Sequence, residues 1–288
     1  MIPCFFVSDL HGRRPAYREL FRLIASERPR AVFLGGDILP PANLFPEDSP
    51  DDFLQDYLSA ELTQLRHSMA AVYPLIFLIM GNDDVRTEEG AVLGLHEAGL
   101  IHYIHNRHEW LDSYHIYGYA YVPPTPFLLK DWERYDVSRY VGPGDVSPED
   151  GSYSMPIDEY EKRNATIKND LRLLAGDTPL ARAVFLFHAP PYNTNLDRCA
   201  LDGIKVEGIP LDPHVGSIAI HSFIETRQPI LTLHGHIHES ARLTGMWRDR
   251  IGRTHLFSAA HDGEELAVIK FDLEDVGRAT RHLIPLGA

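Results

Sequence analysis

Short apolar runs that end directly on polar turns recur along this chain of 288 residues, and they constrain its fold more than any other feature. They lie at residues 2–8, 31–34, 75–80, 183–187 and 230–233. Segments with apolar residues at helical spacing separate these runs. Apolar strands that alternate with helices are typical of sheets that are buried on both faces. The sequence therefore predicts an α/β fold.

Amphipathic segments predict the helices of this fold. They are the stretch that opens at Pro15, the apolar stripe of residues 53–65 after a cap at Ser49 and Pro50, and residues of about 160–174 and 217–226. Two later apolar runs, at 255–259 and 266–272, are expected to be closing strands and are candidates for a hairpin. Because the chain shows no internal repeat and no interdomain linker, we expect residues 1–288 to form one domain.

Charge and composition disfavour several classes of function. Asp and Glu outnumber Lys and Arg by 41 to 27, and the net charge of −14 disfavours a surface that binds nucleic acid. No apolar run approaches the ~18–20 residues of a membrane span, and the apolar start is too short for a signal peptide, so we expect a cytoplasmic protein without membrane contact. Cys4 and Cys199 cannot form a disulfide framework. The 16 histidines are the compositional exception, and their positions matter most for function.

Residues 121–156 interrupt the pattern, because closely spaced prolines and glycines prevent long helices and strands. A segment of this length without regular structure is typical of a lid or a surface insertion. Its aromatic and cationic side chains are suited to cover an anionic ligand, and they are Phe127, Lys130, Trp132, Arg134, Tyr135, Arg139 and Tyr140. The alternative is a segment that packs on the surface or on a neighbouring subunit of a homo-oligomer.

Polar residues follow five of the predicted strands. They are Asp9 and His11, then Asp37, Asn82 and Asp83, His188, and finally His236 and His238. Ligands of α/β sheets bind at the carboxyl ends of the strands, so we expect these side chains to meet at one place. Carboxylate, amide and imidazole groups are ligands of divalent metal ions. Each motif alone is also explained by a capping turn, a tight turn or a solvated loop, and only their combination predicts a metal site.

The five motifs, in this order, resemble those of the calcineurin-like metallophosphoesterase superfamily, whose blocks run D-x-H, G-D, G-N-H-D/E, H and G-H-x-H. Here they read Asp9-Leu10-His11, Gly36-Asp37, Gly81-Asn82-Asp83-Asp84, His188 and Gly235-His236-Ile237-His238. The resemblance implies a four-layer α/β/β/α sandwich with a dinuclear metal site at the carboxyl ends of its strands. It also implies a set of ligands, in which Asp9, His11 and His238 hold the first metal, Asn82, His188 and His236 hold the second, and Asp37 bridges both.

The chemistry of two divalent ions accounts for these residue types. Two ions about 4 Å apart neutralise phosphate oxygens and lower the pKa of a bound water. We therefore predict a metal-dependent hydrolase that cleaves a phosphodiester or a small phosphate ester by attack of a metal-bound hydroxide. Mn, Fe, Mg, Co, Ni and Zn are all candidate ions. The alternatives are a metal-binding sensor or scaffold that has lost turnover, and a nuclease, which the acidic charge disfavours.

Two departures from the family pattern narrow this prediction. The residues Ile38-Leu39-Pro40 after Asp37 lack the acid and the arginine with which the protein Ser/Thr phosphatases continue their second block, so a phosphoprotein phosphatase is disfavoured. Asp83 stands where the third block has a histidine, which leaves the general acid open between Asp83, with Asp84 beside it, and other residues. Those other candidates are His221, His234 and His261. A carboxylate at position 83 would repel a dianionic monoester, so we expect a preference for diesters.

Overall fold

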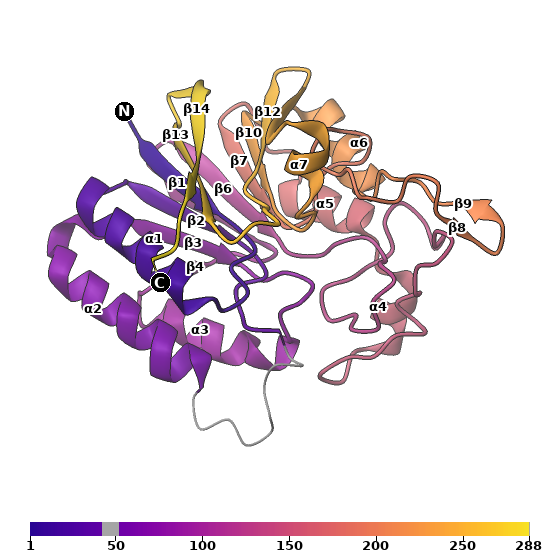
Figure 1. Ribbon diagram of the computed structural model, residues 1–288, viewed down its shortest axis with the longest axis horizontal. Helices are drawn as coiled ribbons and strands as arrows, with labels where there is room; N and C mark the ends of the chain where they lie inside the picture. Colours follow the sequence, from indigo (N-terminus) through magenta and orange to yellow (C-terminus); the bar gives the residue numbers. More distant parts are fainter. Residues whose placement is uncertain (42–51, 288) are drawn as a thin grey trace.

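The computed structural model describes residues 1–41 and 52–287, and two six-stranded sheets form its centre. Buried apolar side chains of both sheets form one continuous core. Helices cover the outer faces, α1 to α3 on one side and α5 and α6 on the other, which gives the predicted α/β/β/α layers (Figure 1). Among the described residues, no helix combines the length and the apolar character that a membrane crossing needs.

The first sheet has the strand order β14-β13-β1-β2-β3-β4. Its strands are β1 (Pro3–Val7), β2 (Ala31–Gly35), β3 (Leu75–Ile79), β4 (His102–Tyr103), β13 (Leu266–Asp272) and β14 (Asp275–Ile284). β1 to β4 run parallel, whereas β13 lies antiparallel to β1 and to β14. The connecting helices are α1 (Arg14–Glu27), α2 (Ser59–Met69), which continues a π-helix at Phe53–Leu58, and α3 (Glu89–Glu97). Single turns of 3-10 helix lie at Ala70–Val72 and Arg86–Glu88.

The second sheet has the order β11-β12-β10-β7-β6-β5. Its strands are β5 (Arg107–Leu111), β6 (Tyr114–Tyr119), β7 (Ala183–Phe187), β10 (Leu231–His234), β11 (Arg248–Ile251) and β12 (Thr254–Ser258). The four inner strands are parallel and the two edges are antiparallel. The remaining elements are α4 (Glu159–Asn164), α5 (Ile167–Ala175), α6 (Ile218–Arg227), α7 (Ser240–Thr244) and a small hairpin of β8 (Lys205–Val206) and β9 (Ile209–Pro210).

The five predicted apolar strands are confirmed, but two other predictions are wrong. β12 and β13 do not form a hairpin, because they lie in different sheets and β13 pairs with β14. The helix predicted over 160–174 is two helices, since Thr166 leaves the helical conformation and its hydroxyl caps α5 at the amide of Asn169. The predicted cap at Ser49 and Pro50 lies outside the described residues, and Asp52 caps the π-helix instead.

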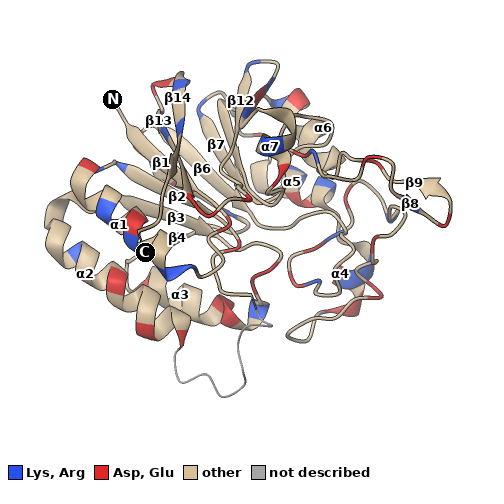
Figure 2. Ribbon diagram, viewed as in Figure 1, with Lys and Arg blue, Asp and Glu red and all other residues tan. Residues whose placement is uncertain are grey.

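The segment of residues 121–156, called the insertion below, contains no helix and only isolated bridges, as the prolines and glycines predict. Each of its three cations has an acidic partner within the protein, and the partner of Arg139 is Glu149. Lys130 and Glu133 form a fully buried pair at 2.6 Å, and Arg134 pairs with Asp170 at 2.7 Å. The Trp132 and Tyr135 rings are buried as well. The side chains of Lys130, Trp132, Arg134 and Tyr135 therefore stabilise the insertion itself. For these four residues, the expectation that they cover a ligand is wrong. Figure 2 shows the acidic and basic segments along the chain.

Candidate metal centre

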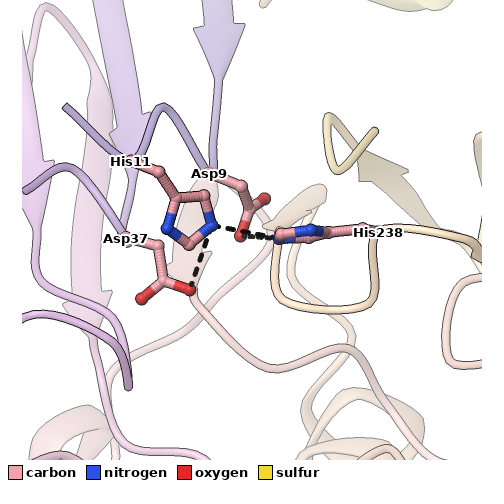
Figure 3. Close-up of side chains that lie close together, drawn as sticks. All are labelled: Asp9, His11, Asp37 and His238. Carbon is pink, nitrogen blue, oxygen red and sulfur yellow. Dashed lines mark hydrogen bonds and ion pairs between the residues drawn. The ribbon is translucent and has the colours of Figure 1, made fainter. Parts of the chain in front are cut away.

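The loops that follow β1, β2, β3, β7 and β10 meet at the carboxyl ends of the parallel strands of both sheets. They bring together all seven residues that the sequence singled out as ligands. Asp9, His11, Asp37 and His238 form the first group, and one ligand atom from each lies within 4.8 Å of the other three. Figure 3 shows their side chains converging from β1, β2 and β10.

The first group has the geometry of a cation site. Nε2 of His11 lies 3.3 Å from Nε2 of His238, and the latter lies 3.4 Å from Oδ1 of Asp9. Oδ2 of Asp9 and Nδ1 of His11 are buried without a hydrogen-bond partner. Buried polar atoms without partners are costly, and a divalent ion between carboxylates and imidazoles would satisfy them. The donor set therefore fits a metal.

The second group consists of Asp37, Asn82 and His188, with His236 beside them. Nδ1 of His188 donates to the carbonyl of Gly35 at 2.8 Å, which points Nε2 at two oxygens, Oδ1 of Asn82 at 3.0 Å and Oδ2 of Asp37 at 3.2 Å. A neutral imidazole would then present a lone pair to two acceptors, an arrangement that only a proton or a metal ion makes favourable. The ring centres of His188 and His236 are 5.2 Å apart.

Asp37 belongs to both groups. Its Oδ2 atom is 3.2 Å from Nε2 of His188 and 3.9 Å from Nε2 of His11. Its Oδ1 atom accepts a hydrogen bond from the amide of Asp83 at 2.8 Å, which fixes the carboxylate. One carboxylate thus lies between two clusters of suitable donors.

The backbone at this site adopts conformations that most residues avoid. Asp9, His11, Asp37 and His236 all have positive φ, between 44° and 74°. Such strain is found where the surrounding structure holds a functional residue in place. Two glycines let neighbouring loops approach each other closely. A β-carbon on Gly81 would lie 2.3 Å from Oδ1 of Asp37, and one on Gly235 would lie 2.0 Å from Oγ of Ser8.

The electrostatics of the site also favour cations, because they keep the Asp9 and Asp37 carboxyls ionised. Burial opposes ionisation of Asp9 and Asp37, yet the neighbouring His238 and His188 hold the pKa of each carboxyl below its ordinary value. Burial lowers the pKa of His188, but the Asp37 carboxylate outweighs it and raises that pKa to about 10. Burial lowers the pKa of His236 to about 3, which keeps this imidazole neutral and able to bind a metal. The carboxylates of Asp9 and Asp37, which attract the protons of the neighbouring imidazoles, would attract a metal ion in the same way.

The two predicted carboxylates of the third block, Asp83 and Asp84, occupy different environments. Asp83 lies at the site, where its Oδ2 atom is 3.7 Å from Nδ1 of His11 and its side chain is 43% exposed. Asp84 is fully buried and accepts hydrogen bonds from three backbone amides, those of Ile38, Leu39 and Gly81. Burial and the charge of Asp37 raise the pKa of Asp84 to about 8. Asp84 thus ties the loop after β2 to the loop after β3 and has no surface toward a substrate.

The structure does not bring His234 to the site. Its two ring nitrogens are hydrogen-bonded inside the protein, to the carbonyl of Ala189 at 2.9 Å and the hydroxyl of Thr232 at 2.7 Å. The ring stacks on Phe187 and has no exposed surface. Burial lowers the pKa of His234 to about 3, so the ring stays neutral. This position corrects the expectation of a proton donor, because no ring nitrogen faces the ligand groups.

The other histidine candidates are engaged elsewhere. Nδ1 of His221 donates to the carbonyl of Tyr192 at 2.6 Å, and Nε2 of His261 lies 3.1 Å from a carboxylate oxygen of Glu265. A pocket of about 670 Å³ adjoins the ligand groups, and neither His221 nor His261 is among the described residues that line it. A different histidine, His214, does line the pocket.

His214 is a pocket residue that the sequence did not mark as a candidate. Its Nδ1 atom lies 2.8 Å from Oδ1 of Asp197, which is fully buried and also accepts hydrogen bonds from the amides of Asn193, Thr194 and Gly216. Both residues belong to the β7–α6 loop, residues 188–217. No motif spacing marks them, and only the Asp–His pairing seen in space distinguishes this histidine from a solvated one.

The chain is similar to known proteins in sequence and in fold. The family model described as calcineurin-like phosphoesterase matches residues 2–240. No curated protein matches the chain significantly. The solved structures similar to this chain include TT1561 of Thermus thermophilus, with a TM-score of 0.55, 15% identity and 98% of each chain covered.

Two more similar structures show the same fold. A dimetal phosphatase from Danio rerio has a TM-score of 0.50 and 11% identity, with 99% of each chain covered. The phosphopantetheinyl hydrolase PptH from Mycobacterium tuberculosis has a TM-score of 0.51 and 12% identity, with 90% of this chain and 89% of that chain covered. Because the family model matches residues 2–240, the chain belongs to the calcineurin-like phosphoesterase family, a family of metal-dependent phosphoesterases with a dinuclear divalent metal centre.

Proposed function

We propose that this protein hydrolyses a phosphodiester or a small phosphate ester with two divalent ions held at the strand ends. The observation that carries this proposal is the shared Asp37 carboxylate, whose Oδ2 atom lies 3.2 Å from His188 and 3.9 Å from His11. Asp37 would be the ligand that the two ions share. The terminal ligands are Asp9, His11 and His238 for one ion, and Asn82, His188 and His236 for the other.

The bound ions would supply Lewis acidity to the phosphate oxygens and an acidified water at neutral pH. The protein's own residues then have three tasks, which are to hold the ions, to select the charge of the substrate and to protonate the leaving group. For the first task, the three amide hydrogen bonds to Asp84 keep the loops after β2 and β3 in register. That register would let Asp37 and Asn82 hold the same ion.

Asp83 would select the charge of the substrate. It lines the pocket beside Asp37 and Asn82, and its carboxylate stands close to His11. A monoester dianion carries one more negative charge than a diester, so the Asp83 carboxylate disfavours the monoester. The proposal is therefore a phosphodiesterase in preference to a phosphomonoesterase.

His214 would protonate the leaving group. Asp197 fixes its ring through Nδ1, which leaves Nε2 as the nitrogen available to the pocket. A buried carboxylate that orients an imidazole is a recurring arrangement in acid–base catalysis. His214 comes from the β7–α6 loop and not from the third block, where Asp83 replaces the usual histidine.

The test is hydrolysis by metal-free protein that is reloaded separately with Mn, Mg, Co, Ni or Zn. We expect about two ions per chain by elemental analysis and hydrolysis of nitrophenyl phosphodiesters only after loading. Asp37→Asn should remove the activity, whereas Asp177→Asn, on an exposed loop before β7 and at the opposite end of the strands, should not. Full activity of the metal-free protein would refute the proposal. Two bound ions without turnover would instead favour the metal-binding sensor or scaffold.

A further inference from the structure

The pocket beside the metal centre is larger than a phosphate group requires. Its volume of about 670 Å³ falls in the range of sites that enclose a whole organic ligand. Resting on the function proposed above, we propose that this pocket binds an uncharged, largely apolar organic group that the substrate carries on its phosphate. The ester would place its phosphorus at the Asp37 end and this group between the insertion and the β7–α6 loop.

The walls of the pocket are mainly apolar. One wall is the insertion, with several prolines between 123 and 143, and with Phe127 and Tyr140, whose side chains are exposed at the surface. The facing wall is the β7–α6 loop with Leu201, Val206 and Leu211. Exposed aromatic and aliphatic groups that gather around one cavity indicate a binding surface for apolar ligands.

The two walls touch each other at their tips. A β-carbon on Gly144 of the insertion would lie 3.2 Å from Val206 and 4.0 Å from Leu211. Gly144 has a φ of 87°, a conformation that suits glycine, so the tip approaches closely without a side chain. This contact joins the insertion to the β8–β9 hairpin, and the pocket extends from there to Asp37 and His238 at the metal centre.

The charge of the pocket excludes a second anionic group on the ligand. Among its described lining residues there is no Lys or Arg, whereas Asp145, Asp212 and Glu239 belong to it. The cations of the insertion do not compensate, because Lys130, Arg134 and Arg139 are each paired with an acidic side chain of the protein. A polyphosphate, an oligonucleotide or an ester with a carboxylate would therefore meet repulsion beyond the metal ions. An uncharged apolar group avoids this repulsion.

The experiment uses metal-loaded protein and nitrophenyl phosphodiesters that share one leaving group and differ in the second substituent. The substituents are methyl, phenyl, hexyl and carboxymethyl. We expect kcat/KM to rise on the order of tenfold to a hundredfold from methyl to phenyl or hexyl, mainly through KM, because burial of a ring or chain of this size is worth that factor. The carboxymethyl ester should be no better than the methyl ester.

A variant of the pocket wall and a matched surface control test whether the preference for large substituents arises in the pocket. Leu211→Asp puts a charge into the wall at a partly exposed position and should lower kcat/KM for the phenyl ester at least tenfold more than for the methyl ester. Leu173→Asp, at a 68% exposed position on α5, is the control and should leave the ratio unchanged. Equal kcat/KM for all four wild-type substituents would overturn the inference while the proposed function stands.

Binding separates this inference from the proposed function. Calorimetry with dimethylphosphinate and methyl(phenyl)phosphinate measures affinity without turnover, because these monoanions have no P–O ester bond to cleave. If no diester is hydrolysed but the phenyl compound binds at least tenfold more tightly, the pocket assignment holds and the proposed reaction fails. Equal affinity of the two phosphinates would overturn the pocket assignment, whatever the turnover.

Discussion

Replacement of Asp83 by asparagine tests the proposed substrate charge most directly, because it removes one charge and keeps nearly the same shape. The Asp83 carboxylate lies 3.7 Å from Nδ1 of His11, and the Asp83 amide donates to Asp37 at 2.8 Å. A phosphate bound between His11 and Asp37 would stand roughly 6 Å from this carboxylate, where one unit charge is worth about 2–3 kcal/mol at an effective dielectric constant of about 20.

That energy corresponds to a factor of tens to about a hundred in kcat/KM for each unit of charge on the substrate. Since a monoester dianion carries one more charge than a diester, Asp83→Asn should raise the monoester-to-diester ratio of kcat/KM by this factor before screening by the metal ions. Asp83→His should shift the ratio in the same direction and add a proton donor. The assay is kcat/KM for matched nitrophenyl mono- and diesters, with metal content measured on each variant.

Asp177→Asn is again the control for a lost surface charge, because Asp177 is exposed and precedes β7. The reasoning is refuted if wild type prefers the monoester, or if the ratio does not move in Asp83→Asn while both ions are retained. Loss of an ion from Asp83→Asn would show that Asp83 is itself a metal ligand. The repulsion argument would then be wrong as well.

Three further predictions concern the metals, the proton donor and the insertion. Chelation or Asp37→Asn should reduce diester hydrolysis to background, and re-addition of Mn should restore wild type only, as measured by initial rates and elemental analysis. His214→Asn should lower kcat on the order of a hundredfold for alkyl leaving groups, which need a proton, and far less for nitrophenolate; equal losses would argue against the Asp197-oriented donor. Lys130→Met should destabilise the fold by about 3–5 kcal/mol in urea titration, because it leaves the Glu133 charge buried, and Lys130→Met with Glu133→Gln should recover part of the loss.

The ligand loops could be predicted from the sequence because the end of a strand is determined by residues that are neighbours in the chain. An apolar run and the polar turn that follows it are neighbours in the chain, so Asp9, Asp37, Asn82 and His188 could be placed without knowing how the sheets pair. The pairing of strands, by contrast, depends on segments that are far apart in the sequence. β12 and β13 are both apolar, and nothing in either run indicates that they belong to different sheets. β5 escaped prediction since four of its five residues face outward or are only partly covered.

Charged residues of the insertion show a second limit. Sequence gives the charge of Lys130 and Arg134 but not their partners, and Glu133 and Asp170 neutralise them. The same limit hid His214, whose partner Asp197 lies 17 residues away along an irregular loop. In both cases the tertiary contact determines whether a charged or titratable side chain serves the fold or the ligand. Such contacts leave no local periodicity.

The backbone of the ligand residues links the stability of the fold to the metals. Asp9, His11, Asp37 and His236 hold positive φ values that cost on the order of 1 kcal/mol or more each, a sizeable share of the roughly 5–15 kcal/mol that stabilises a domain. These φ values are maintained only because the surrounding structure fixes the loops from several sides. One such contact is the hydrogen bond from the amide of His236 to Oδ1 of Asp9, at 3.0 Å. Ions that bind the folded site and not the unfolded chain stabilise this arrangement by mass action. The strained backbone therefore preorganises the site for cations, and it does so at a cost to the free energy of unfolding of the metal-free protein.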